Sequence, residues 1–319
     1  MPAVVSPANT WPPRRHVDQN HRCAGPASPT LAVVISDPAS PVAAAARPFG
    51  GSAAGCARMW CAVASAAARR MLCYRATIAA SILSNIILTV LRGHVALAVW
   101  EQRPGLAGYD STAAITFTVL GQSLVTTFAV FGGMIDMPWR IRNGSIEVDL
   151  VRPVGFQRWW LGLEVGRAAV YFASRAVPAA IVGALLFDLR RPGSPGACAA
   201  FAVGLGLALL VSFGLRYLVG LSAFWMTDAR GVQAVSALVM MFFSGAVLPL
   251  ALFPGPLGTI AGLAPFGAVV QVPMDLYLGT ADGGTLRALA FQAVWAALLL
   301  LTARVLTTAG LRRLVVQGG

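Results

Sequence analysis

The sequence predicts an all-α polytopic membrane protein with six transmembrane helices. Six long apolar runs fill most of the chain, at residues 77–100, 113–135, 168–189, 197–224, 232–252 and 286–308. An α-helix needs about 20 apolar residues to cross a hydrocarbon core of about 30 Å, and each run meets that length. Charged residues are 11% of the sequence, against about 25% in soluble domains. Runs this long and continuous are not typical of barrel strands, so the prediction is helical.

Arginine placement predicts the orientation of these helices in a cell membrane. The predicted cytosolic segments hold Arg58, Arg69, Arg70, Arg75, Arg140, Arg142, Arg152, Arg158, Arg230, Arg312 and Arg313, and the opposite loops hold Arg103, Arg190, Arg191 and Arg287. Cytosolic segments carry the excess of basic residues, so both termini are expected in the cytosol. The pair Arg190 and Arg191 opposes this assignment. The net charge of +12 does not indicate a nucleic-acid partner, because its arginines follow the membrane edges rather than one soluble face.

The chain divides at about residue 57. Residues 1–57 are rich in proline, alanine, serine and glycine, a composition that cannot bury a core, and we expect a disordered tail. Residues 58–319 form the predicted six-helix transmembrane domain.

The loop between the second and third runs contains one short, sharply bounded element. Asn143-Gly144 is a turn signal, and Pro153 ends any helix by the preceding residue. Between them lie apolar residues and two acidic ones, Glu147 and Asp149, in a pattern that fits either a strand or a short helix. Such an element suits docking to a soluble partner, and it equally suits a solvated connector.

Several segments together resemble type-2 ABC transporter permeases. The similarity rests on residues 144–154, on Trp159, Trp160, Gly166 and Arg167, on Phe224, Trp225 and Asp228, and on the segments 244–249 and 253–254. Their order and spacing are similar to six-span exporter subunits that pair with a drug-exporter-like ATPase. The similarity extends from about Arg69 to the C-terminus.

This resemblance implies an efflux subunit of the cell membrane (the plasma or inner membrane), surrounded by membrane lipids. It also implies a dimer with a second permease, identical or homologous, that works with two separate ATPase subunits. It implies a cytosolic coupling helix at about residues 142–152, followed by a proline. The residues implied in ATPase coupling are Arg142, Gly144, Glu147, Asp149, Arg152 and Pro153. The expected function is ATP-driven outward movement of a hydrophobic or amphipathic substrate.

The chain contains no lysine, which bears on its energy source. The phosphate-binding P-loop requires a lysine that reaches the β- and γ-phosphates. We therefore expect no cofactor in this chain, with ATP and magnesium bound by the partner ATPase. We find no catalytic or metal-binding motif, and we expect a transport subunit rather than an enzyme. The alternative is a secondary transporter driven by an ion gradient, which usually shows internal repeats and acidic residues near the membrane midplane.

A broken apolar stretch separates the fifth and sixth runs. Residues 253–262 and 263–278 are both apolar, and prolines interrupt them. One interpretation is a re-entrant helical pair at the outer face, since irregular backbone at membrane depth must be covered by protein or line water. The other is an interfacial loop stiffened by proline.

Two arginines inside the apolar runs are candidates for an inner vestibule. Arg175 and Arg216 both lie roughly 12 Å from the predicted inner boundary, counted at 1.5 Å per residue. A charge at that depth usually faces a cavity or a partner, although arginine also snorkels toward the headgroups. Glu164, at the mouth of the third run, is a candidate partner for one of them.

Overall fold

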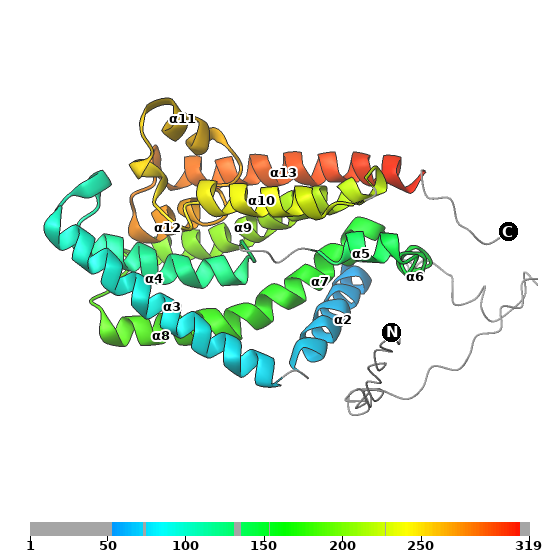
Figure 1. Cartoon of the computed structure of the whole chain (residues 1–319), viewed down its shortest axis with the longest axis horizontal. Coiled ribbons are helices and arrows are strands. Elements are labelled where there is room, and N and C mark those ends of the chain that lie inside the picture. The colour runs from blue at the N-terminus through cyan, green and yellow to red at the C-terminus, as the bar shows by residue number, and fades with distance from the viewer. Residues whose placement is uncertain (1–52, 73–74, 131–134, 153, 227, 313–319) are drawn as a thin grey trace, which may run out of the picture. The chain divides into compact units, whose positions relative to one another are not determined.

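The computed structural model describes residues 53–72, 75–130, 135–152, 154–226 and 228–312, all within the compact unit Ala46–Gly319. The regular elements in these ranges are all helical, as the sequence predicts (Figure 1). The predicted tail lies mostly outside the described residues. The first helix of the described residues, α2 (Ala53–Leu72), begins within the last five positions of the predicted tail.

Four of the described helices are long and apolar enough to cross a membrane. They are α3 (Arg75–Gln102), the continuous helix Phe156–Leu186, the helix Pro195–Phe224 and α13 (Gly284–Leu311). The helix Phe156–Leu186 consists of α7 (Phe156–Tyr171), the π-helical turn η2 (Phe172–Ala176) and α8 (Val177–Leu186), and the helix Pro195–Phe224 of α9 (Pro195–Leu221) and η3 (Ser222–Phe224). They correspond to the first, third, fourth and sixth predicted spans.

The second and fifth predicted spans contain shorter helices than expected. These are α4 (Ser111–Thr127) and α10 (Arg230–Phe243). After α4, Ala129 adopts φ 53°, which leaves the right-handed helical region. After α10, Gly245 adopts φ 81°, and Pro249 follows. The apolar runs continue beyond both helices, so composition alone overestimates the helix lengths. The six-span count therefore stays a prediction.

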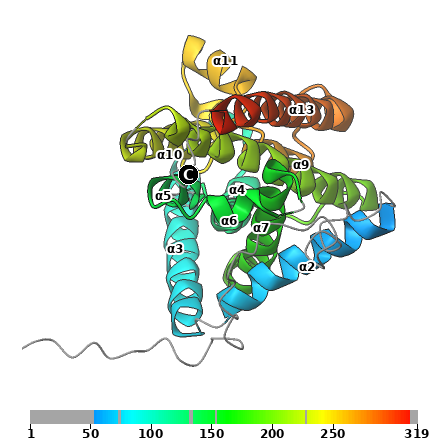
Figure 2. The same ribbon diagram turned by 90° about the vertical axis from the view of Figure 1, so that its right-hand side faces the viewer.

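Helix α2 packs against α7 and was not among the predicted elements (Figures 1 and 2). The close approach depends on Gly166 of α7. A Cβ atom at this position would overlap the backbone of Ala64 and the methyl group of Ala67 on α2. Glycine is therefore required where the two helices cross.

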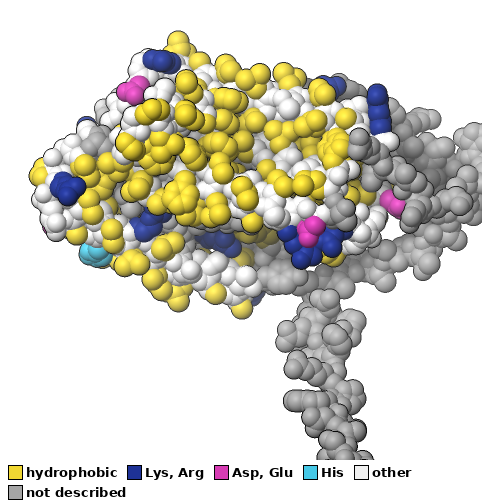
Figure 3. Space-filling model, turned by 45° about the horizontal axis from the view of Figure 1, so that its top comes forward, with side chains coloured by type: hydrophobic (Ala, Val, Ile, Leu, Met, Phe, Trp, Pro, Cys, Tyr) yellow, Lys and Arg dark blue, Asp and Glu magenta, His cyan; other side chains and the backbone are white. Residues whose placement is uncertain are grey.

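The two ends of the helical unit carry different short elements (Figure 1). At one end lie α5 (Met137–Arg142) and α6 (Glu147–Leu150). At the other lie η1 (Leu106–Gly108), η4 (Leu250–Leu252), α11 (Gly255–Leu263) and α12 (Gln271–Leu278). The broken stretch thus does contain two short helices, while their re-entrance into a membrane stays a prediction. Figure 3 shows hydrophobic side chains over much of the face between the two ends.

The core joins α4, α9, α12 and α13. Gln292 of α13 is buried and donates hydrogen bonds to the carbonyl oxygens of Gly204 on α9 (3.2 Å) and Ala268 before α12 (2.8 Å). Gly214 of α9 has no space for a Cβ atom against Leu299 of α13. Small residues and a polar side chain that donates hydrogen bonds across the helices are typical of helix contacts in membranes, where apolar burial gives little driving force.

Candidate functional site

The segment from α5 to α6 is a compact helical hairpin whose turn the sequence specifies. Gly144 adopts φ 77°, which favours glycine, and the Asn143 side chain accepts hydrogen bonds from the backbone N–H (3.1 Å) and hydroxyl (2.7 Å) of Ser145. The N–H of Ile146 donates to the carbonyl oxygen of Arg140 (3.1 Å). The element that follows is a short helix, which resolves the strand-or-helix ambiguity. Pro153 lies outside the described residues.

Asp149 is the fixed centre of this hairpin. Its side chain is fully buried, and its two carboxylate oxygens lie 3.0 and 2.9 Å from Nη1 of Arg140. Nε of Arg152 lies 3.4 Å from the same carboxylate. The guanidinium of Arg152 stacks 3.9 Å from the centre of the Trp159 ring on α7. Asp149, which was predicted to contact the ATPase together with Glu147, therefore does not reach the surface, because Arg140 and Arg152 both lie against its carboxylate.

The opposite side of α6 is exposed and partly apolar. Glu147 is exposed, Val148 is 60% exposed and Val151 is 85% exposed. Trp139 on α5 is also exposed. The exposed part of the hairpin thus combines Glu147 with three large apolar side chains.

A small groove lies beside the hairpin. It has a volume of about 220 Å³ and lies between α5 and the start of α10, with Trp139, Arg142 and Asp228 among its lining residues. Arg142 Nη1 lies 3.9 Å from Asp228 Oδ1, and both side chains are largely exposed. The structure therefore brings the α5–α6 hairpin close to the segment around Asp228. The resemblance to permeases related these two segments only by their order in the chain.

Glu164 and Arg216 form a buried ion pair between α7 and α9. Arg216 Nη2 lies 2.6 Å from Glu164 Oε2, and Arg216 is only 2% exposed. Arg167 adds a second cation, with Nε at 2.9 Å and Nη2 at 2.8 Å from the same oxygen. Arg216 also hydrogen-bonds through Nε to the Ser212 hydroxyl (3.3 Å). Arg216 therefore does not snorkel.

Arg175 meets this cluster at Tyr171, because the Arg167 guanidinium also lies over the Tyr171 ring, 5.1 Å from its centre. Arg175 belongs to the π-helical turn η2, and its guanidinium stacks 3.8 Å from the centre of the Tyr171 ring. Its carbonyl oxygen accepts a hydrogen bond from the Asn85 amide of α3 (3.0 Å). The two arginines of matched depth thus make different contacts in the structure: Arg216 pairs with Glu164, and Arg175 stacks on Tyr171.

Two arginines with structural contacts were not identified as such from the sequence. Arg167 is three residues after Glu164 on the same helix, and this i,i+3 spacing is the signal that predicts their pairing. Arg92 lies inside the first apolar run. Its guanidinium donates hydrogen bonds to Gln122 Oε1 on α4 (2.6 Å) and to the carbonyl oxygens of Ala246 and Val247 beyond α10. An arginine in an apolar run was the available signal.

Long apolar helices, buried ionic contacts between them and a helical hairpin at one end define a polytopic helical membrane protein. No group of three or more metal-ligating side chains is found in the part of the chain that the structure describes. The chain belongs to the ABC-2 family of transporter proteins, whose family model matches residues 83–318. It is thus an ABC transporter permease, a membrane transport component. No curated protein and no solved structure matches the chain.

Proposed function

We propose that this permease is the membrane subunit of an ATP-driven exporter of hydrophobic or amphipathic substrates. Membership of the ABC-2 family implies pairing with an ABC ATPase. ATP and magnesium would be bound by that ATPase, because a chain without lysine has no P-loop. A second permease copy or homologue would complete the transporter. The family assignment favours this function over a secondary transporter driven by an ion gradient.

The α5–α6 hairpin is the proposed ATPase contact, and its geometry supports that role. Asp149 and its two arginines hold the hairpin in one shape, and Trp159 links that shape to α7. Glu147, Val148 and Val151 then form the exposed contact surface. A push on a hairpin held this way is transmitted to α7 rather than absorbed by a loose loop. This surface is the observation that carries the proposal.

Two of the residues proposed to line a vestibule, Glu164 and Arg216, are buried in this conformation. They form an ion pair between α7 and α9, and Arg167 adds a second cation to the same carboxylate. A polar path past them would require the two helices to separate. We therefore propose that ATPase-driven movement of the hairpin changes the α7–α9 contact, and that Arg175 is not part of that contact.

The test uses the permease reconstituted with its ATPase in lipid nanodiscs. The isolated permease is expected to show no ATP turnover, and the complex is expected to hydrolyse ATP. The double variant Glu147→Arg and Val148→Asp should lose ATPase binding in a pull-down and lose turnover by the complex. Glu101→Arg, a charge reversal at an exposed glutamate near the opposite end of the bundle, is the matched control. Unchanged ATPase binding in the double variant would refute the docking role of the hairpin.

A further inference from the structure

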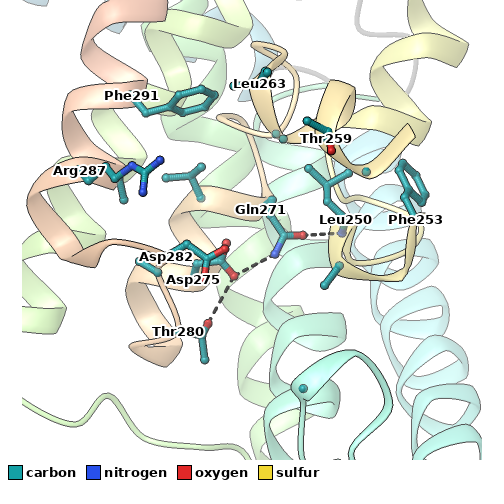
Figure 4. Close-up of a pocket in the computed structure, with 18 of the residues that line it drawn as sticks. Leu250, Phe253, Thr259, Leu263, Gln271, Asp275, Thr280, Asp282, Arg287 and Phe291 are labelled. Carbon is teal, nitrogen blue, oxygen red and sulfur yellow. Dashed lines mark hydrogen bonds between the residues drawn. The ribbon is translucent and has the colours of Figure 1, made fainter. Parts of the chain in front are cut away.

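A large pocket, drawn in Figure 4, lies beside α11 and α12, at the end of the bundle opposite the α5–α6 hairpin (Figure 1). Its volume is about 680 Å³, and its walls come from α11, α12, the start of α13 and the segment before α4. Pockets that bind small organic molecules fall between about 300 and 1,000 Å³. The pocket is thus large enough for a drug-sized ligand within a single chain.

One wall of the pocket is acidic, and its central group is Asp275 of α12. Oδ1 accepts hydrogen bonds from the Tyr109 hydroxyl (3.1 Å), the Gln271 amide (2.9 Å) and the Thr280 hydroxyl (3.4 Å). Gln271 is itself fixed, because its Oε1 accepts from the N–H of Leu250 (3.0 Å). Oδ2 accepts no hydrogen bond from the described residues. The carboxylate is therefore held in place with one oxygen available to a ligand.

A second carboxylate lies on the same side of the pocket. Asp282 lies beside Asp275 in Figure 4, and its charge adds to burial in raising the pKa of Asp275. Arg287 of α13 also lines the pocket, yet within the described residues it makes no ion pair with either carboxylate. When both carboxylates are ionised, they outnumber the Arg287 guanidinium and leave the lining with an excess of negative charge.

The remaining walls are apolar and aromatic. Leu250, Phe253, Leu263 and Phe291 line the pocket, with Phe291 on α13 and Phe253 at the entry to α11. Aromatic faces attract organic cations through their quadrupole, and apolar walls bind a hydrocarbon body. The combination of a fixed carboxylate with aromatic walls favours a ligand that is both cationic and apolar.

We propose that this pocket binds a monovalent lipophilic cation, whose charge lies at Asp275 and Asp282 and whose apolar body lies against Phe253 and Phe291. Binding would require only the permease chain, so the proposal goes beyond ATP-driven export and does not depend on the ATPase. A cation prefers the ionised carboxylates, and protonation weakens its binding. Among the described lining residues, the other ionisable groups are the Tyr109 hydroxyl and the Arg287 guanidinium.

Calorimetry with tetraphenylphosphonium tests the site, using the full chain in nanodiscs of zwitterionic lipid. Nanodiscs of the same lipid without protein serve as the blank. Asp275→Asn keeps the size and the acceptor oxygen of the side chain, and Asp282→Asn changes an exposed residue. Each is expected to weaken binding about tenfold, the effect of losing one charged contact. Asp188→Asn, which neutralises an exposed carboxylate outside the pocket, should bind like the wild type.

Three further measurements separate this site from nonspecific adsorption. Phe291→Ala should weaken tetraphenylphosphonium binding, and the anion tetraphenylborate should bind no better to wild-type nanodiscs than to the blank. Affinity for the cation should fall as the pH drops through about 7 in the wild type and depend less on pH in Asp275→Asn. Thermal unfolding verifies that each variant is folded. Wild-type affinity in both Asp275→Asn and Asp282→Asn, or equal binding of the anion, would overturn the proposal.

Discussion

Asp149 is buried with both carboxylate oxygens on one nitrogen of Arg140, so the two ends of the α5–α6 hairpin are joined by a charged contact. The two residues are nine positions apart in sequence, and the turn at Gly144 brings them together. Charge-assisted hydrogen bonds are stronger than neutral ones, and an unpaired buried carboxylate or guanidinium is costly. The shape of the proposed ATPase contact therefore depends on an acidic residue that does not reach its surface.

Asp149→Ala is expected to destabilise the permease, whereas Glu147→Ala is not. Removing the Asp149 carboxylate leaves two arginines without their shared partner and should lower stability by about 2 kcal/mol. Glu147 is exposed and makes no ion pair among the described residues, so its loss should change stability by less than about 0.5 kcal/mol. Thermal unfolding in detergent measures both. Equal unfolding temperatures for the two variants would show that the Arg140 contact adds nothing.

In the α5–α6 hairpin, the sequence alone predicts the turn but not the orientation of the acidic side chains. Asn143 and Gly144 predicted the turn, because few residues tolerate its backbone angles. The inward orientation of Asp149 was not predictable, because a four-residue helix has no usable period and the deciding contact is with Arg140, outside it. The similarity to known permeases located the element without distinguishing its buried acid from its exposed one.

Gly166→Val is expected to separate α2 from α7. A Cβ atom at this crossing meets the backbone of Ala64, which has no flexible end that can move aside. Overpacking of this kind typically costs about 1–3 kcal/mol. Trypsin should then cleave faster at Arg69 and Arg70, which are exposed near the end of α2.

The matched control for this change is Gly206→Val. Gly206 is an exposed glycine of α9, and a Cβ atom there meets nothing within 4 Å. It should leave both the unfolding temperature and the tryptic cleavage rate unchanged. Identical cleavage rates for the two variants would mean that the α2–α7 crossing tolerates a side chain.

Arg92→Met is expected to destabilise the junction between α3 and the segment after α10. The guanidinium supplies donors to the carbonyl oxygens of Ala246 and Val247, which no longer have partners within a helix because α10 ends at Phe243. Each buried polar group left unsatisfied costs about 1–3 kcal/mol. Arg92→Lys should restore only part of the loss, because an ammonium group lacks the planar fork of guanidinium donors.

Arg191→Met provides the comparison, since Arg191 is exposed and makes no ion pair among the described residues. Thermal unfolding of both variants in the same nanodiscs measures the difference. If Arg92→Met unfolds at the same temperature as Arg191→Met, the carbonyl contacts are not stabilising.

The early end of α10 also explains why the sequence overestimated this helix. The apolar run continues through residue 252. Nothing in the run itself indicates that Arg92, more than 150 residues earlier, donates to the carbonyl oxygens that lack helical partners after α10 ends. The left-handed Gly245 was the local signal. The long helices were predicted more accurately because length and apolar composition are sufficient to define them.

The arginine bias predicts that a cysteine at position 280 is labelled from outside the cell. Thr280 is exposed, at the end of α12, opposite the α5–α6 hairpin. In an otherwise cysteine-free chain, Thr280→Cys should react with a membrane-impermeant maleimide in intact cells. A chain that retains only Cys61, which is exposed on α2, should react only after the cells are opened. The reverse pattern would invert the assigned orientation.

Asp275 should make the stability of the permease depend on pH. Burial, with the charge of Asp282 adding to it, raises the pKa of Asp275 from 3.8 to about 7, against the lowering effect of its hydrogen bonds. Between these two values the folded chain holds a proton that the unfolded chain has lost, so the contribution of Asp275 to the free energy of unfolding falls as pH rises through this window and is constant above about 7. Asp275→Asn lacks this titration. The wild type should therefore lose stability relative to Asp275→Asn between about pH 4 and pH 7, measured by thermal unfolding in nanodiscs without added cation. A wild-type-minus-variant difference that stays constant across this range would show that the carboxylate titrates normally in the fold.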